Sequence, residues 1–76
     1  MYKPRITIKV VNKNGKVKRV VSRKRRRIYQ FLKAGNFQNC LLEVKVSYES
    51  GGCNKGVYEN KTDSINALRA FMEGDI

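Results

Sequence analysis

The chain contains the same pattern of residues twice, and this repeat constrains its fold more than any other feature. Apolar and polar residues alternate at residues 6–10 and again at residues 42–46, about 36 residues later. Such alternation is typical of a strand with one buried face. In each copy a glycine-containing turn, a second strand-like segment and a helix-like segment follow. The sequence therefore predicts two ββα units, at residues 5–35 and 41–74.

We expect these units to form one α+β domain over residues 1–76, because two copies are too few for a solenoid. The predicted architecture is a single four-stranded antiparallel sheet with two helices packed on one face. Ser22 is the expected N-cap of the first helix, and the second is expected to start at residues 62–64 and to end at Gly74. Apolar residues at helical spacing predict the buried stripes: Ile28, Phe31, Leu32 and Gly35 in the first helix, and Ile65, Leu68, Phe71 and Met72 in the second.

The first turn is predicted from Asn14-Gly15, a pair that favours a two-residue type I′ hairpin loop. This loop would set Val10 opposite Arg19 and Ile8 opposite Val21. The inner face would then hold Ile6, Ile8, Val10, Val17 and Val21, with Arg19 near its rim. The outer face would hold Thr7, Lys9, Val11, Lys13, Lys16, Lys18 and Val20.

The second turn is less clearly specified by the sequence. A loop of Gly51-Gly52 sets Val57 opposite Val46 but places Glu59 opposite Val44, so a bulge or a longer loop is expected. In this register Tyr58 faces outward with Lys45. Phe37, after the first helix, is expected to fold back under the helix end.

The charge is concentrated in the first half of the chain. There are 17 Lys and Arg against 6 Asp and Glu, a net charge of +11. Residues 1–38 hold thirteen of the basic residues and no acidic one. A bias of this size indicates a polyanionic partner, above all nucleic acid.

Five consecutive cations lie where the first helix is expected to start: Arg23, Lys24, Arg25, Arg26 and Arg27, here called the basic run. The amide groups at a helix start carry partial positive charge, so cations are unfavourable there. The same amides and guanidinium groups favour a phosphate ligand. Two alternatives remain open, a solvated charged surface and a nuclear localisation signal.

Other residues extend this candidate phosphate-binding site. Tyr29 and Tyr58 are candidate surfaces for base stacking, although each also suits the edge of a small core. The hairpin lysines also suit a second role, discouraging strand pairing between molecules. The hairpin residues assigned to the nucleic-acid site are Lys9, Lys13, Lys16, Lys18 and Arg19.

The sequence gives little support for catalysis, so we do not expect an enzyme. It has no histidine, no glycine-rich phosphate loop and no clustered carboxylates, and we expect no metal or cofactor. Cys40 and Cys53 are expected to be free thiols, because the hairpin between them separates them by the length of a strand. No apolar run suggests a signal peptide or a membrane segment, so a cytoplasmic location is expected.

The second unit resembles small strand-turn-strand-helix domains, including the arm-type DNA-binding domains of phage integrases. The resemblance runs from residues 46–48 to residues 71–73 and consists of a turn, a helix cap and apolar spacing.

Two hypotheses for function follow from these observations. The first is a non-enzymatic DNA- or RNA-binding protein of a bacterium, phage or mobile element, which contacts backbone phosphates. The second is an inhibitor of a host protein, such as an anti-CRISPR, that uses the basic surface to block an acidic or nucleic-acid-handling surface. A homodimer formed through a sheet edge is compatible with either.

Overall fold

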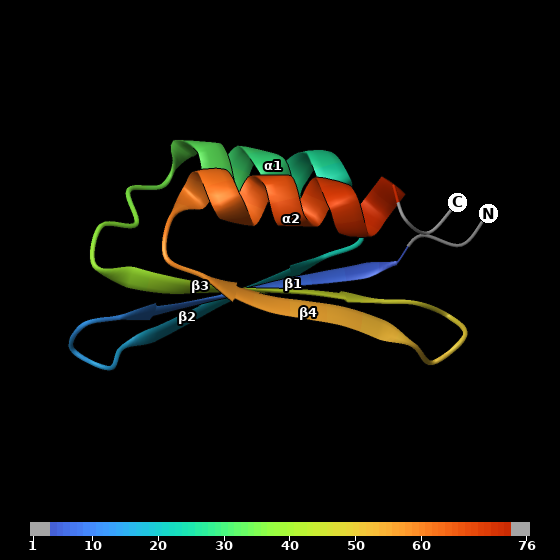
Figure 1. Cartoon of the computed structure of the whole chain (residues 1–76), viewed down its shortest axis with the longest axis horizontal. Helices are drawn as coiled ribbons and strands as arrows, with labels where there is room; N and C mark the ends of the chain where they lie inside the picture. The colour runs from blue at the N-terminus through green and yellow to red at the C-terminus, as the bar shows by residue number, and fades with distance from the viewer. Residues whose placement is uncertain (1–3, 74–76) are drawn as a thin grey trace.

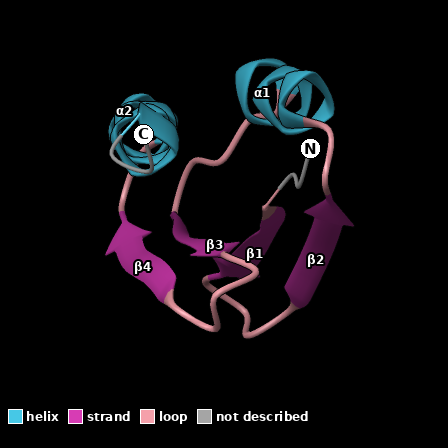
Figure 2. Ribbon diagram, turned by 90° about the vertical axis from the view of Figure 1, so that its right-hand side faces the viewer, coloured by secondary structure: helices cyan, strands magenta, loops and turns pink. Residues whose placement is uncertain are grey.

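The structure is a computed structural model that describes residues 4–73. Its elements are β1 (Arg5–Asn12), β2 (Val17–Ser22), α1 (Arg25–Ala34), β3 (Cys40–Ser47), β4 (Cys53–Tyr58) and α2 (Lys61–Glu73). The strands form one antiparallel sheet in the order β2-β1-β3-β4. Both helices lie on the same face of this sheet, α1 above β1 and β2 and α2 above β3 and β4 (Figures 1 and 2). The predicted α+β architecture is therefore confirmed.

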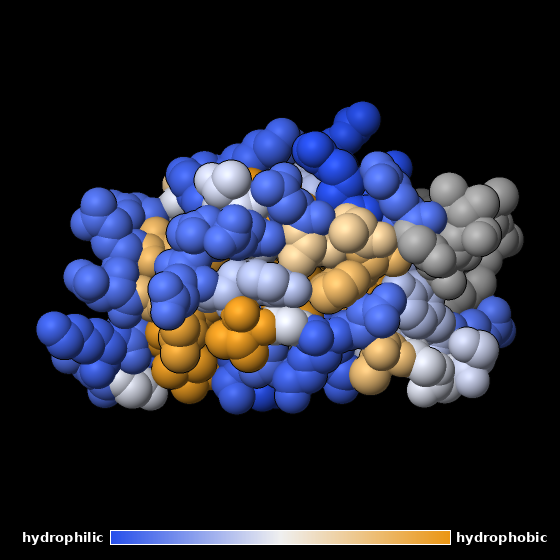
Figure 3. Space-filling view, in the orientation of Figure 1, coloured by the Kyte–Doolittle hydropathy of each residue, from blue (hydrophilic) through white to orange (hydrophobic). Residues whose placement is uncertain are grey.

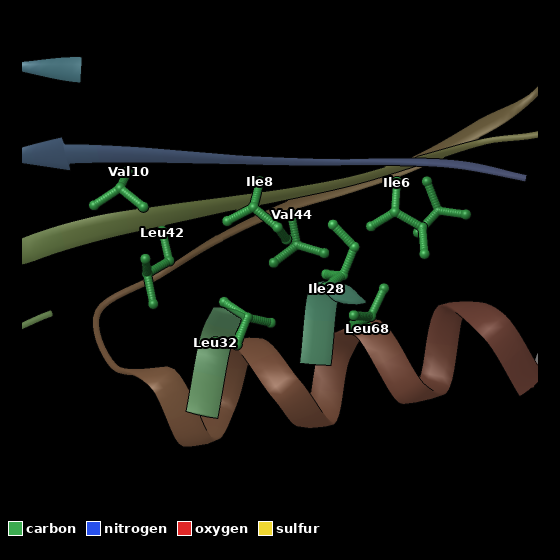
Figure 4. Close-up of a cluster of buried hydrophobic side chains, with 9 residues drawn as sticks. Ile6, Ile8, Val10, Ile28, Leu32, Leu42, Val44 and Leu68 are labelled. Atoms are coloured by element: carbon green, nitrogen blue, oxygen red, sulfur yellow. The ribbon is translucent and has the colours of Figure 1, made fainter. Parts of the chain in front are cut away.

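The core lies between the sheet and the two helices. The central strands β1 and β3 contribute alternate residues, as their apolar and polar alternation predicts. The helices contribute side chains that point toward the sheet (Figure 4). The hydrophobic side chains that are buried are Ile6, Ile8, Val10, Ile28, Leu32, Leu42, Val44, Val46 and Leu68.

The predicted helical stripes are correct in outline. Ile28 and Leu32 are buried, and Phe31 is half-buried beside Phe37, with ring centroids 5.6 Å apart. Phe37 folds back over Gly35, as expected, and leaves no room there for a Cβ atom. Gly35 ends α1 in an extended conformation, so glycine at this position accommodates the Phe37 ring. Gly74, expected to end α2, lies outside the described residues.

The first hairpin turn differs from the prediction by one residue. Asn12 pairs with Lys16 through a backbone hydrogen bond, and its side-chain Oδ1 accepts hydrogen bonds from the amides of Asn14 and Lys16. The loop is therefore three residues long, with Gly15 at φ +83°. This is the conformation of a type I turn followed by a left-handed residue, which Asn-Gly also supports.

That one-residue difference reverses the predicted faces of β2. Ile8 pairs with Val20 and Val10 with Lys18. Because side chains alternate along a strand, Lys18 and Val20 lie on the helix side of the sheet. Val17 and Val21, expected on the inner face, lie on the uncovered face instead, and Arg19 lies there beside Lys9.

The second turn has the same form as the first. Tyr48 pairs with Gly52 through a backbone hydrogen bond, and Gly51 has φ +93°. The longer loop expected for this hairpin is present. It places Tyr58 opposite Leu42, on the helix side, so the prediction that Tyr58 faces outward with Lys45 was wrong.

Two further expectations concern the cysteines and membrane insertion. Cys40 and Cys53 are both free, and Cys53 pairs with Ser47, at the opposite end of β3 from Cys40. Neither helix of residues 4–73 has the length and apolar character needed to span a membrane.

Candidate nucleic-acid interface

The start of α1 carries unfavourable charge without compensation from its own helix. The N-cap residue is Lys24, and in α1, all of which the structure describes, no side chain caps the helix and the first turn has no acidic residue. Ser22, the expected cap, is the last residue of β2, and its hydroxyl accepts a hydrogen bond from the Lys24 amide. All five residues of the basic run are exposed. The exposed helix start therefore combines a positive dipole end with a cluster of cations.

A groove between the two helices extends this cluster. Arg25, Arg26 and Lys33 of α1 line it together with Arg69 of α2. Tyr29, half-buried against the core, lies in the same groove. The remaining lining residues are Gln30 and Glu73. The groove holds four cations and one carboxylate, with an aromatic ring beside them, which suits phosphate groups.

Arg69 and Lys33 were missed as site residues in the sequence. Arg69 is a single cation in the middle of a helix, and no local pattern marks it. It joins Arg25 and Arg26 only because α1 and α2 pack side by side on the sheet (Figure 2). In Figure 3 hydrophilic residues cover much of the helix layer, along the top of the view.

The hairpin lysines do not join this cluster. Lys13 lies in the β1–β2 turn and Lys16 directly follows it. The six residues of β2 separate this turn from the basic run, a distance of about 20 Å at the usual rise of a strand. In Figure 1 the β1–β2 turn lies at the left end of the molecule, whereas α1 begins right of centre, away from this turn.

Two of the predicted site residues pack on the helix side of the sheet. The Lys18 ammonium lies over the Phe31 ring, 5.6 Å from its centroid, a cation–π arrangement. Tyr58 is half-buried against the core, with its hydroxyl over Gly56. Neither residue lies with Lys9 on the uncovered face, so the prediction that Lys18 shares the outer face with Lys9 was wrong.

The uncovered face of the sheet brings together a different set of residues. Arg5, Lys9 and Lys45 of the central strands line a shallow pocket with Arg19 of β2. Lys55 of β4 lies opposite Lys45. Among the described residues, the large hydrophobic side chains that are exposed, Val17, Val21, Leu41 and Val57, all lie on this face. We call it the open sheet face, and of its cations the sequence predicted only Lys9 and Arg19 as site residues.

Neither a metal-binding cluster in residues 4–73 nor a similar protein indicates a function for this chain. Residues 4–73 contain no group of three or more His, Cys, Asp or Glu side chains placed to hold a metal ion. No protein-family model, curated protein or solved structure matches this chain. Its function is therefore inferred from its own residues.

Proposed function

We propose that this chain is a small, non-enzymatic nucleic-acid-binding protein that holds backbone phosphates at the start of α1 and in the groove between α1 and α2. The observation that carries the proposal is the electrostatics of the α1 start, where an exposed basic run occupies the positive end of a helix dipole. Such a site favours an anion with several oxygen atoms.

The groove residues support a polymeric ligand. Arg69 and Lys33 continue the positive charge away from the helix start, so successive phosphates along a nucleic-acid backbone find cations in turn. Phosphate contacts contribute affinity without sequence information. We therefore expect binding that depends strongly on salt and weakly on base sequence.

The test is fluorescence anisotropy with labelled single- and double-stranded DNA and RNA over a series of salt concentrations. The logarithm of the association constant should fall with log salt by about 0.9 for each duplex phosphate neutralised. The variant Arg25→Gln/Arg26→Gln should reduce that slope by about two, because it removes two phosphate contacts.

The matched control is Thr62→Glu/Ala70→Glu, which lowers the net charge by the same two units. Both positions are exposed on α2, and neither lines the groove. This control should keep nearly the full slope. If the groove variant and the control bind alike, net charge alone explains the binding and the proposed site is wrong.

A second candidate function, inhibition of a host protein, is favoured by the exposed aliphatic side chains of the open sheet face. A pull-down that recovers one stoichiometric protein partner after nuclease treatment would support it. Loss of every partner on nuclease treatment would exclude it.

A further inference from the structure

The open sheet face carries pairs of like charges that the fold does not need. Lys9 lies directly opposite Arg19, and Lys45 directly opposite Lys55. Like charges in directly opposed positions destabilise a sheet. The same scaffold could have placed a carboxylate in each pair, as it does between Lys9 and Glu43 on the neighbouring strand.

The face as a whole is strongly positive. Its five cations, Arg5, Lys9, Arg19, Lys45 and Lys55, stand against one carboxylate within the described residues, Glu43, which gives a net charge of +4. That carboxylate already has a partner, since its Oε1 lies 3.2 Å from the Lys55 ammonium. The missing counter-charge therefore points to an anionic ligand. A second copy of the face would only repel it.

The arrangement of charged and apolar residues distinguishes nucleic acid from protein as that ligand. Protein interfaces place apolar residues at the centre and polar residues at the rim. Here Lys9 and Lys45 of the central strands lie toward the middle of the face, whereas Val17 of β2 and Leu41 of β3 both lie opposite Val11, at one end of the strands. Val21 and Val57 lie on the edge strands β2 and β4. The middle of the face, which is apolar in a protein interface, is therefore charged here, as expected for a surface that contacts phosphates.

The form of nucleic acid follows from which side chains are absent. No aromatic residue lies on the open sheet face within the described part of the chain, so unstacked bases find no ring to stack on. The exposed valines suit contact with apolar groups such as thymine methyls in a duplex groove. Double-stranded nucleic acid fits this face better than a single strand.

We infer that the open sheet face is a second duplex-binding surface, so that one copy of the chain holds two nucleic-acid segments at once. The helices cover one face of the sheet and leave the other open (Figure 2), so the inter-helix groove and the open sheet face point in opposite directions. The molecule measures 20 and 17 Å across its shorter axes, which keeps the two segments apart. The inference rests on the proposed function, because it requires the groove to bind the first segment.

The experiment compares three variants that each lower the net charge by two. The open-face variant is Lys9→Gln/Lys45→Gln, the groove variant is Arg25→Gln/Arg26→Gln, and the control is Thr62→Glu/Ala70→Glu. A biotinylated DNA duplex is immobilised and loaded with protein, and capture of a second, fluorescent duplex is measured. Removing one member of each like-charge pair should not unfold the sheet, which circular dichroism checks.

The wild type and the control should capture the second duplex, whereas capture by the open-face variant should fall roughly 10- to 100-fold at moderate salt, because two phosphate contacts are lost. The open-face variant should still bind the first duplex through the groove. With duplex in excess, sedimentation should show two duplexes per protein chain.

Each contrary result identifies what failed. One duplex per chain, or equal capture by the open-face variant and the control, overturns the second surface and leaves the proposed function standing. Binding of the wild type to single strands alone also overturns the inference, and absence of binding to every DNA and RNA probe removes the proposed function itself. A nuclease-resistant protein partner that is lost only in the open-face variant, with duplex capture unchanged, assigns the face to a protein and overturns the inference.

Discussion

The two ββα units are built on one plan, and their helix starts differ sharply. Helix α1 begins at Arg25 and α2 at Lys61, 36 residues later, so the N-cap Lys24 corresponds to Asn60. Asn60 caps α2: its Oδ1 accepts a hydrogen bond from the Asp63 amide, and its own amide group donates to the Asp63 carboxylate. Arg27 occupies the position of Asp63 in the first unit. At these two equivalent positions the second unit has a reciprocal cap and the first unit has two cations.

This difference shows that a ββα unit of this plan folds without a basic run at its helix start. Asn at an N-cap and Asp in the first turn stabilise a helix, and the second unit uses both. The first unit tolerates their absence because Ile28 and Leu32 anchor α1 in the core and Lys61 closes its far end. The Lys61 ammonium donates a hydrogen bond to the Lys33 carbonyl, 3.2 Å away. Tertiary packing thus holds a helix whose own start is destabilising, and the exposed side chains of Arg25, Arg26 and Arg27 remain available for a ligand.

The largest expected effect on stability tests whether the two units are equivalent in the core. Leu32 and Leu68 are equivalent residues, and both are fully buried. Each Leu→Ala substitution should lower the free energy of unfolding by roughly 2–5 kcal/mol, because it removes buried methyl groups and leaves a cavity. Urea denaturation measures the loss. A cost below 1 kcal/mol at either position would mean that the two helices do not pack equivalently, contrary to the comparison.

The two hairpin turns should also respond alike. Gly15 and Gly51 have positive φ with open space around them, so Ala there meets backbone strain without a steric clash. Gly15→Ala and Gly51→Ala should each cost roughly 1–2 kcal/mol. Gly52→Ala is the matched control, because Gly52 lies beside Gly51 without positive φ and should change the unfolding free energy little. Equal effects at Gly51 and Gly52 would contradict the three-residue loop.

These turns also show where sequence and structure diverge. The strand order of each unit, the inner faces of β1 and β3 and the helical stripes follow from alternation and periodicity, which are local. The register of β2 does not, because Asn14-Gly15 is compatible with loops of two or three residues. The Asn12 side chain, by bonding two loop amides, selects the longer one. The shift of one residue in register places Lys18 on the helix side of the sheet and Val21 on the uncovered face, each the reverse of the prediction.

The candidate site was predictable only in part for a similar reason. The basic run is contiguous in sequence and was found directly. Arg69 joins it through helix packing, and Lys45 faces Lys55 only in the register set by the second turn. Neither the packing of α1 beside α2 nor the register between β3 and β4 has a clear local signal in the sequence, so these residues could not be assigned before the fold was known.

The helix caps should respond differently in the two units. Asn60→Ala should cost about 1 kcal/mol, because it removes the side-chain cap of α2. The equivalent change, Lys24→Ala, removes no side-chain hydrogen bond and should leave the unfolding free energy nearly unchanged. Thermal denaturation should separate the pair by roughly 4–8 °C for a domain of this size. If both variants melt together, the two helix starts are not the different structures described.

The variant with the smallest expected change in stability tests whether the basic run serves the stability of the fold or the binding of a ligand. Lys24→Asn/Arg27→Asp transfers the cap of α2 to the start of α1, and it should raise the unfolding free energy by about 0.5–1 kcal/mol. The same variant should bind duplex DNA more weakly, because it replaces two cations of the basic run and adds a carboxylate. Urea denaturation and anisotropy measure the two quantities on one sample.

The control for this transfer is Lys24→Gln/Arg27→Gln, which removes the cations without supplying the reciprocal cap. It should weaken binding without the gain in stability that the cap provides. A transferred cap that destabilises the chain would show that the basic run supports the fold directly, and unchanged duplex affinity would show that it does not contact phosphate. Opposite signs for stability and affinity are expected only if the first unit has given up a stabilising cap in favour of a ligand.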